Sequence, residues 1–554
     1  MHRFPLAALP ALLAACVTAS PTPPATQPSS PQASPSAPSP SAGPRHFRIL
    51  HINDVYKVEG LEGGRIGGLA RVRTLRTKLG EDGTPVLLLH AGDMLFPSVM
   101  GKYLLGQPMI RVMNLLDGDA TAFDKNLVVT FGNHEFDNSD PGVLLGRTAT
   151  SDFHWVSSNT RYCEQKGSCR DRFSARTPNV VETLVVDEGG VKVGIFGLVL
   201  DNQRQDYVAY EYAPEARRAV IRSAIDALHR DGAQLIIALT HQDMDEDVAL
   251  ASEYPEVDLV VGGHDHLYQQ KQVGNTWVSK ADADAKSALV YDVEVPPSGK
   301  PRITPRQVML DASVPKDPVV EAEVQKSLKQ LEGKMGPNVV VGTTENLLEG
   351  VEPAVRGRET ALGNFLSDVL RARMKSDIAF VNGGAIRIND NIAPGPIHKT
   401  DMEGIFYFSN KVVDFSLTGA ELLDLLRSSV SRVYAGDGRF LQVAGIRFRY
   451  HPRSAGDHPT YEINPSDVQV QRQGDAQFRP LDVNARYTAA TLDYLWKSGV
   501  KDGYPLFAQG EGGKSPALLH PDDTPDWRKT TEDAIAALPD RKVTTRIEGR
   551  ILAE

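Results

Sequence analysis

The stretch Val86-Leu87-Leu88-Leu89-His90-Ala91-Gly92-Asp93 predicts a buried β-strand that runs directly into an acidic residue. Its apolar part is continuous rather than alternating, which is typical of a strand that is covered on both faces. Such strands belong to α/β sheets, where functional side chains follow the carboxyl ends of the strands. Gly92 permits a tight turn that directs the carboxylate of Asp93 inward.

The same pattern recurs on both sides of this stretch. Further strand-like runs end at potential metal ligands: Phe47 to Ile52 before Asn53-Asp54, Leu127 to Phe131 before Asn133-His134, Gln234 to Leu239 before His241, and Val257 to Val261 before His264 and His266. Helices are predicted between strands at residues 69–79 and 216–228, and Val191 to Leu198 predicts another strand. This alternation of strands and helices predicts an α/β sandwich.

The residue types at the strand ends indicate a metal centre. Carboxylate and amide oxygens bind hard divalent ions, and imidazole suits transition metals. Two ions about 3.5–4 Å apart need a shared ligand, and Asp93 is the natural bridge. Two ions can hold an in-line nucleophile and the phosphoryl oxygens together, so we predict a two-metal phosphoesterase site.

These motifs resemble the calcineurin-like metallophosphoesterase superfamily, whose fold is a four-layer α/β/β/α sandwich; here it would span residues 46–314. The resemblance implies one metal held by Asp54, Asp93 and His266. It implies a second metal held by Asp93, Asn133, His241 and His264. In Gly132-Asn133-His134-Glu135-Phe136-Asp137, it implies that His134 and Asp137 form the catalytic dyad. His134 would protonate the leaving oxygen and Asp137 would orient it.

The first motif departs from the family pattern, because Tyr56 stands where the family has histidine. Tyr56 could bind the first metal as a phenolate, or the ion could lose a ligand that water replaces. An ordinary phenol has a pKa near 10, so phenolate ligation needs a strongly Lewis-acidic ion. We expect two divalent ions, of zinc, manganese, cobalt or magnesium, and iron joins this set if Tyr56 is a ligand.

The second half of the chain resembles the substrate-binding domain of bacterial 5′-nucleotidases, a family that includes UDP-sugar hydrolases. A linker helix is expected at residues 315–339 and an α/β C-terminal domain at 340–554. The resemblance rests on residues 358–364, 382–387, 440–445 and 502–504. It implies phosphate or ribose contacts from Arg358 and Arg387, a hydrogen bond from Asn382, base stacking on Phe440, and ribose binding by Asp502. Tyr494 is our choice for a second stacking ring, with Trp496 as the alternative.

The N-terminus predicts export. Residues 1–16 resemble a lipoprotein signal peptide in which Leu13-Ala14-Ala15-Cys16 provides the lipidated Cys16. Residues 17–45 are rich in proline and serine, so they predict a disordered tether. We expect a lipoprotein on the periplasmic side of the outer membrane or at the cell surface. In an exported chain, Cys163 and Cys169 are expected to form a disulfide.

Composition limits the remaining functions. A length of 554 residues suggests at least two domains, and a net charge of −10 argues against binding to nucleic-acid polymers. The only membrane contact we expect is the lipid anchor, and we expect a monomer. Beyond the N-terminus no apolar run approaches the roughly 20 residues of a membrane span.

The resulting prediction is an exported two-metal phosphohydrolase that removes phosphate from nucleotides by in-line attack of a metal-bound hydroxide. The substrates would be nucleoside 5′-monophosphates, with nucleoside di- and triphosphates or UDP-sugars as further substrates. Two alternatives remain open from the sequence. One is a 2′,3′-cyclic nucleotide phosphodiesterase, and the other is a non-catalytic nucleotide-binding surface lipoprotein with an altered first metal site.

Overall fold

The structure is a computed structural model, and it describes residues 45–119, 121–201, 205–297, 299–454, 456, 458–507 and 515–554. The chain divides into two compact units, Met1–Gly43 and Pro44–Glu554, and all described residues belong to the second. The expected signal peptide with Cys16 lies outside the described residues, as does the expected tether apart from its last residue. Within the described part of the chain, no helix is long and apolar enough to cross a membrane.

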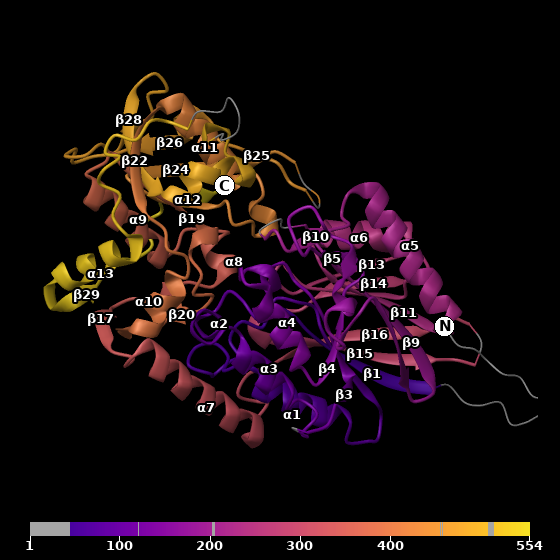
Figure 1. Ribbon diagram of the computed structural model, residues 1–554. Coiled ribbons are helices and arrows are strands. Elements are labelled where there is room, and N and C mark those ends of the chain that lie inside the picture. Colours follow the sequence, from indigo (N-terminus) through magenta and orange to yellow (C-terminus); the bar gives the residue numbers. More distant parts are fainter. Residues whose placement is uncertain are drawn as a thin grey trace, which may run out of the picture. The chain divides into compact units, whose positions relative to one another are not determined.

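Two β-sheets form the centre of the N-terminal domain (Figure 1). In spatial order, the first sheet contains β16 (Arg302–Met309), β15 (Ser287–Val295), β1 (Arg45–Ile52), β2 (Val86–His90), β3 (Asp124–Thr130), β4 (Phe153–Val156) and β7 (Val180–Val181). The second contains β13 (Gln269–Val273), β14 (Thr276–Lys280), β12 (Leu259–Gly262), β11 (Leu235–His241), β9 (Val191–Val199) and β8 (Thr183–Glu188). Strands β1 to β4 are parallel, and so are β9, β11, β12 and β14. The strand ends that carry the predicted ligands therefore lie at one edge of each sheet.

Helices cover the outer faces of both sheets. On the first sheet lie α1 (Leu69–Leu79), α2 (Val99–Leu104), α3 (Gln107–Met113), α4 (Pro141–Ala149) and α7 (Pro318–Met335), and on the second lie α5 (Pro214–Arg230) and α6 (Met244–Glu253). Residues of β2 alternate between two cores: Leu88 packs under the helices, whereas Leu87 and Leu89 pack between the sheets. This burial on both faces explains the continuous apolar run, and it confirms the four-layer α/β/β/α sandwich.

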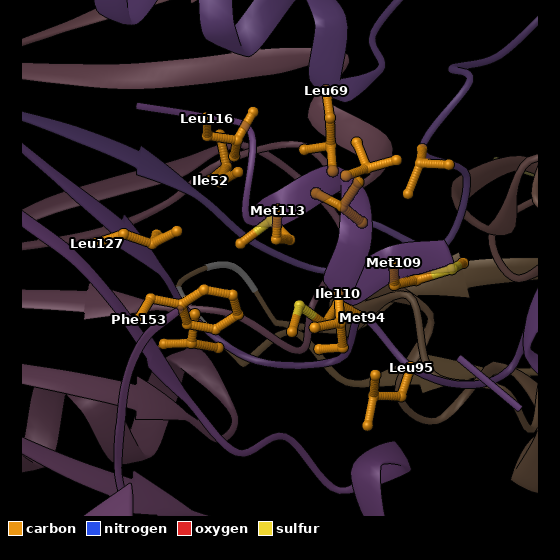
Figure 2. Packing of buried hydrophobic residues seen from close by; sticks show 14 of the residues in the cluster. Ile52, Leu69, Met94, Leu95, Met109, Ile110, Met113, Leu116, Leu127 and Phe153 are labelled. Carbon is orange, nitrogen blue, oxygen red and sulfur yellow. The ribbon is translucent and has the colours of Figure 1, made fainter. Parts of the chain in front are cut away.

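The helix-covered core of the first sheet is shown from close by in Figure 2. Met109, Ile110 and Met113 of α3 lie in one cluster with Leu127 and Phe153 from the strands. Helix α7, at the position of the expected linker helix, buries Val320, Val324 and Leu331 in the same cluster. The helix that connects the two halves of the chain is thus anchored on the N-terminal domain.

The C-terminal domain is built around a mixed sheet with the order β22 (Val412–Thr418), β28 (Arg486–Leu492), β19 (Ile378–Asn382) and β23 (Leu441–Ala444). Its helices are α8 (Glu352–Val355), α9 (Ala361–Met374), α10 (Lys399–Ile405), α11 (Gly419–Val430), α12 (Asp493–Ser498) and α13 (Trp527–Ala537). Smaller sheets are formed by β24 (Ile446–Pro452) with β25 (Tyr461–Glu462), β26 (Val468–Val470), β27 (Arg479–Pro480) and β30 (Ile551–Ala553), by β17 (Val340–Thr344) with β21 (Gly395–His398) and β29 (Lys542–Val543), and by β18 (Leu348–Glu349) with β20 (Asn391–Ile392). Helix α11 begins with a capping box, because Thr418 and Glu421 each accept a hydrogen bond from the other's backbone N–H.

Phe440 belongs to the core of this domain. It immediately precedes β23, its side chain is 0% exposed, and it packs in the cluster that includes Phe380, Phe415 and Tyr504. The ring has no free face for a base, so the stacking role expected for Phe440 does not fit this structure. The physical reason is that the residue fills the space between β23 and the helices over it.

We expect Phe440→Ala to destabilise the C-terminal domain by about 3–5 kcal/mol, because it leaves a cavity in a closed core. Chemical denaturation followed by circular dichroism measures this loss. The matched control is Tyr494→Ala, since Tyr494 is 43% exposed and its removal leaves no core cavity. Wild-type stability of Phe440→Ala, together with weakened nucleotide binding, would restore the stacking role.

Candidate active site

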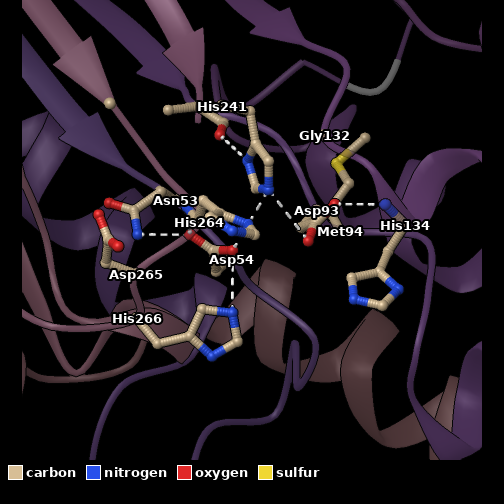
Figure 3. A network of polar contacts seen from close by, with 12 residues as sticks. Asn53, Asp54, Asp93, Met94, Gly132, His134, His241, His264, Asp265 and His266 are labelled. Atoms are coloured by element: carbon tan, nitrogen blue, oxygen red, sulfur yellow. Dashed lines mark hydrogen bonds and ion pairs between the residues drawn. The ribbon is translucent and has the colours of Figure 1, made fainter. Parts of the chain in front are cut away.

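The carboxyl ends of β1, β2 and β11 bring Asp54, Asp93 and His241 together. One ligand atom from each lies within 4.8 Å of the others, and all three residues are buried. Figure 3 shows the imidazole rings of His241 and His266 pointing toward the two carboxylates. The strand-end pattern of the sequence therefore predicted a real cluster of metal-ligating groups.

The backbone at these positions is strained. Asp54, Asp93, His264 and His266 all have positive φ angles, of 52°, 59°, 85° and 61°. Non-glycine residues in this region cost about 1–3 kcal/mol each and concentrate at functional sites. The turns are also tight, since a Cβ atom on Gly132 would lie 2.1 Å from Oδ1 of Asp93. The fold thus holds the backbone of these residues at unfavourable φ angles, and this brings their ligand atoms together.

Asp93 occupies the bridging position. Its Oδ2 lies 3.1 Å from Nε2 of His241 and accepts a hydrogen bond of 2.8 Å from the hydroxyl of Tyr56. Its Oδ1 accepts the backbone N–H of His134 at 2.8 Å. The second ring nitrogen of His241, Nδ1, lies 2.7 Å from the carbonyl oxygen of Ala91, which orients Nε2 toward the carboxylates.

The other side of the site is formed by Asp54, Tyr56 and His266. Oδ1 of Asp54 lies 3.1 Å from Nε2 of His266, and the Tyr56 hydroxyl lies 3.2 Å from the same nitrogen. Oδ2 of Asp54 accepts hydrogen bonds from Asn53 and from the backbone of His264, at 2.7 and 2.9 Å. Tyr56 thus points its hydroxyl into the predicted first metal site.

The donor set fits divalent metal ions. Oδ1 of Asn133 is buried and has no hydrogen-bond partner, and Asn133 lines the same cavity as Asp93 and His264. Burial lowers the pKa of His241, but the carboxylates of Asp93 and Asp54 outweigh it and raise the pKa to about 9. Burial and the charge of Asp93 raise the pKa of Tyr56 well above its usual value. A cation would compensate the two buried carboxylates directly.

His134 and Asp137, for which the sequence predicts a catalytic dyad, lie next to each other. Nδ1 of His134 lies 2.7 Å from Oδ2 of Asp137, and both side chains are largely buried. On the opposite side of the ring, Nε2 of His134 lies 3.5 Å from Nη2 of Arg387 in the C-terminal domain. Arg387 also lies over the ring of Phe408, with 5.3 Å from its guanidinium carbon to the ring centroid.

A cavity of about 290 Å³ joins these groups to the C-terminal domain. Its walls include Asp93, Asn133, His134, His264 and His266 on one side, and Arg356, Asn382, Arg387, Arg432, Arg439, Tyr494 and Asp502 on the other. Asn382, Arg387, Tyr494 and Asp502, for which the sequence predicts substrate contacts, all line this cavity. The hydroxyl of Tyr494 donates to Oδ1 of Asp502 at 3.5 Å. Trp496 instead donates its indole N–H to the carbonyl oxygen of Pro516, which favours Tyr494 as the cavity ring.

Arg358 does not reach this cavity. It pairs with Glu349 through hydrogen bonds of 2.7 and 2.8 Å, and its side chain is 54% exposed. Arg356, two residues earlier, lines the cavity and pairs with Glu352. The segment that carried the resemblance, residues 358–364, begins after Arg356, so the sequence pointed to Arg358 and missed the arginine that turns inward after α8.

Sequence reasoning also missed the carboxylates between the domains. Oδ1 of Asp243 lies 3.3 Å from Nε2 of His264, and Oδ2 of Asp243 lies 3.1 Å from Nη2 of Arg432. Glu352 makes an analogous contact with His266. No local motif marks either residue, because each contact joins segments far apart in the chain. Cys163 and Cys169 form a disulfide, as the sequence suggested.

Comparisons with known proteins agree with this geometry. Residues 47–268 match the model of the calcineurin-like phosphoesterases, and residues 340–509 match that of the 5′-nucleotidase C-terminal domain. The trifunctional nucleotide phosphoesterase protein YfkN of Bacillus subtilis is 25% identical in an alignment of 552 positions that covers 92% of this chain but 35% of that protein. The snake venom 5′-nucleotidase of Crotalus adamanteus is 26% identical over 591 residues, covering 97% of this chain and 94% of the relative.

The fold matches as well. The crystal structure of the 5′-nucleotidase precursor from Thermus thermophilus superimposes with a TM-score of 0.72 at 23% identity, over 92% of this chain and 99% of that one. Together the two family matches cover both domains that form the cavity. The chain therefore belongs to the calcineurin-like phosphoesterases that carry a 5′-nucleotidase C-terminal domain, and it is a metal-dependent hydrolase of phosphoric esters.

Proposed function

We propose that the protein is a two-metal 5′-nucleotidase that removes phosphate from nucleoside 5′-monophosphates. The observation that carries this proposal is the shared cavity, whose walls combine four of the predicted metal ligands with arginines, an aromatic ring and an acidic residue from the second domain. A nucleotide has a phosphate that would lie at the metal ligands, and a base and ribose that would lie at the ring and the acidic residue of the second domain. The fold alone would leave the substrate open.

The two ions would be held as the resemblance implies. Asp54, Asp93 and His266 would hold the first ion, with Tyr56 beside it, and Asp93, Asn133, His241 and His264 would hold the second. Bound there, divalent ions supply an activated nucleophile and neutralise phosphoryl charge. Because the hydroxyl of Tyr56 donates a hydrogen bond to Oδ2 of Asp93, we propose that Tyr56 acts as a hydrogen-bond donor beside the first ion.

The protein groups have separate roles in the reaction. His134, held by Asp137, would give its proton to the leaving ribose oxygen. Arg387 and Arg356 would hold the phosphoryl oxygens, since planar guanidinium groups match phosphate geometry. Asn382 would add a hydrogen bond. Both arginines lie in the C-terminal domain, so phosphate must lie between the two domains to meet metal and arginine together.

The nucleoside would extend toward Tyr494 and Asp502. Stacking of a base on an aromatic ring contributes about 1–3 kcal/mol and tolerates any base. The carboxylate of Asp502 would accept hydrogen bonds from the ribose hydroxyls. Such a subsite also accepts nucleotides with longer phosphate chains, which keeps nucleoside di- and triphosphates and UDP-sugars as proposed secondary substrates.

We also propose that the protein is exported and lipid-anchored through Cys16. The disulfide between Cys163 and Cys169 supports an oxidising compartment. Cys16→Ser should release the protein from the membrane fraction, as measured by fractionation and immunoblotting. Membrane retention of this variant would contradict the anchor.

Metal content tests the two-ion site. After equilibrium dialysis, we expect about two ions per chain by elemental analysis, and about one in Asn133→Ala, which loses a ligand of the second ion only. Asp93→Ala should abolish turnover, because it removes the ligand shared by both ions. An active, chelator-insensitive wild-type protein without bound metal would end this proposal.

The dyad is tested by separating turnover from binding. His134→Gln should lower kcat for AMP by about 10²–10⁴-fold, with much less change in KM, because general acid catalysis acts in the transition state. Steady-state release of inorganic phosphate measures both constants. A large rise in KM at unchanged kcat would assign His134 to substrate binding instead.

Tyr494 is tested with two substrates. Tyr494→Ala should raise KM for AMP by about 5- to 150-fold, which corresponds to a stacking loss of about 1–3 kcal/mol. It should leave hydrolysis of p-nitrophenyl phosphate nearly unchanged, since that ester has no nucleobase or ribose. Tyr494→Phe is the matched control, because it keeps the ring and removes only the hydroxyl. Equal losses on both substrates would refute the stacking role.

A further inference from the structure

Glu352 joins the two domains inside the site. It is the first residue of α8 in the C-terminal domain, and its side chain is 4% exposed. One carboxylate oxygen, Oε2, forms an ion pair with Nδ1 of His266 in the N-terminal domain. The other, Oε1, lies 2.6 Å from Nη2 of Arg356 and 3.0 Å from Nη1 of Arg387. A single buried carboxylate therefore touches a predicted metal ligand and two of the four arginines that line the cavity.

The contact with His266 is made on the ring nitrogen that faces away from the metal site. Nε2 of His266 faces Asp54 at 3.1 Å and the Tyr56 hydroxyl at 3.2 Å. A carboxylate on the far nitrogen fixes the orientation of a ligand histidine and makes it a stronger donor, and loss of such a partner typically costs 10–100-fold in metal affinity. Glu352 is such a carboxylate partner on the far nitrogen of His266.

The arginines explain why a carboxylate can be buried here. An isolated charge would be expensive to remove from water, whereas Glu352 has two guanidinium groups beside Oε1 and the imidazole of His266 beside Oε2. Arg356 and Arg387 come from its own domain and hold the carboxylate in place. His266 comes from the other domain, so the contact exists only while the two domains meet at this point.

We propose that Glu352 is a positioning residue that acts through His266 to strengthen the first metal site from the opposite domain. This inference rests on the proposed two-metal function. It assigns to the C-terminal domain a role in metal binding as well as in substrate binding. It also offers compensation for Tyr56, because a strengthened His266 replaces part of what the missing histidine would contribute.

The test is metal binding without substrate. Full-length wild-type protein and Glu352→Gln are stripped with a chelator and titrated with Mn²⁺ in a calorimeter. We expect the affinity of one of two sites to fall by about 10–100-fold and that of the other to stay unchanged. The matched control is Glu349→Gln, since the carboxylate of Glu349 binds Arg358 outside the cavity. That variant should keep both affinities.

A double-mutant comparison separates positioning from general damage to the fold. His266→Ala identifies the first site, and in this background Glu352→Gln should cause no further loss of affinity. The same loss with and without His266 would overturn the proposal, and so would wild-type affinities in Glu352→Gln. Absence of metal from the wild-type protein would instead overturn the proposed function.

Glu352→Asp keeps the inference testable if the glutamine variant does not fold. It retains the charge beside the arginines but withdraws it from His266 by one methylene group. We expect weakened first-site affinity at an unchanged thermal unfolding midpoint. Unchanged affinity in this variant would contradict the positioning role.

Discussion

The buried carboxylate of Asp93 is the constraint on which the rest of the site depends. It lies between Nε2 of His241 and the hydroxyl of Tyr56, and it accepts the backbone N–H of His134. A buried charge is tolerated only with such partners. Glu135 fixes its position. The carboxylate of Glu135 accepts hydrogen bonds from the backbone N–H groups of Gly132, Asp93, Met94 and Leu95. Two turns from different strands are thereby tied to each other, and the ligands they carry keep one geometry.

The reaction that we propose takes place between the two domains, because residues of both line the cavity. On one side of the cavity Asp243 lies between His264 and Arg432, and on the other Glu352 lies between His266 and two arginines. In both places a carboxylate connects a predicted metal ligand with a cation of the C-terminal domain. Such paired charges are strong only where water is excluded, which holds for Glu352, whose side chain is 4% exposed, and not for Asp243, whose side chain is 41% exposed.

The surroundings of Tyr56 indicate what this tyrosine does at a position where the family has histidine. The sequence left open whether the phenol is a metal ligand. In the structure its hydroxyl donates to Asp93, and burial with nearby carboxylates raises its pKa well above the usual value. These surroundings support a hydrogen-bond donor, and the family relationship together with the intact His134–Asp137 pair argues for an enzyme rather than a pure binding protein.

The sequence by itself indicated the α/β fold and the order of the potential ligands at the strand ends, because these depend on local periodicity. The resemblance to a known family added the four layers and the proposed pair of His134 and Asp137. The continuous apolar run before Asp93 could only be a strand buried on both faces. The tertiary structure decided which side chains enter the cavity. Arg356 rather than Arg358 turns inward, Phe440 fills the core, and Glu352 reaches His266. The physical reason is that such contacts depend on packing between segments distant in the chain, where a shift of two residues changes the direction of a side chain and no local pattern records it.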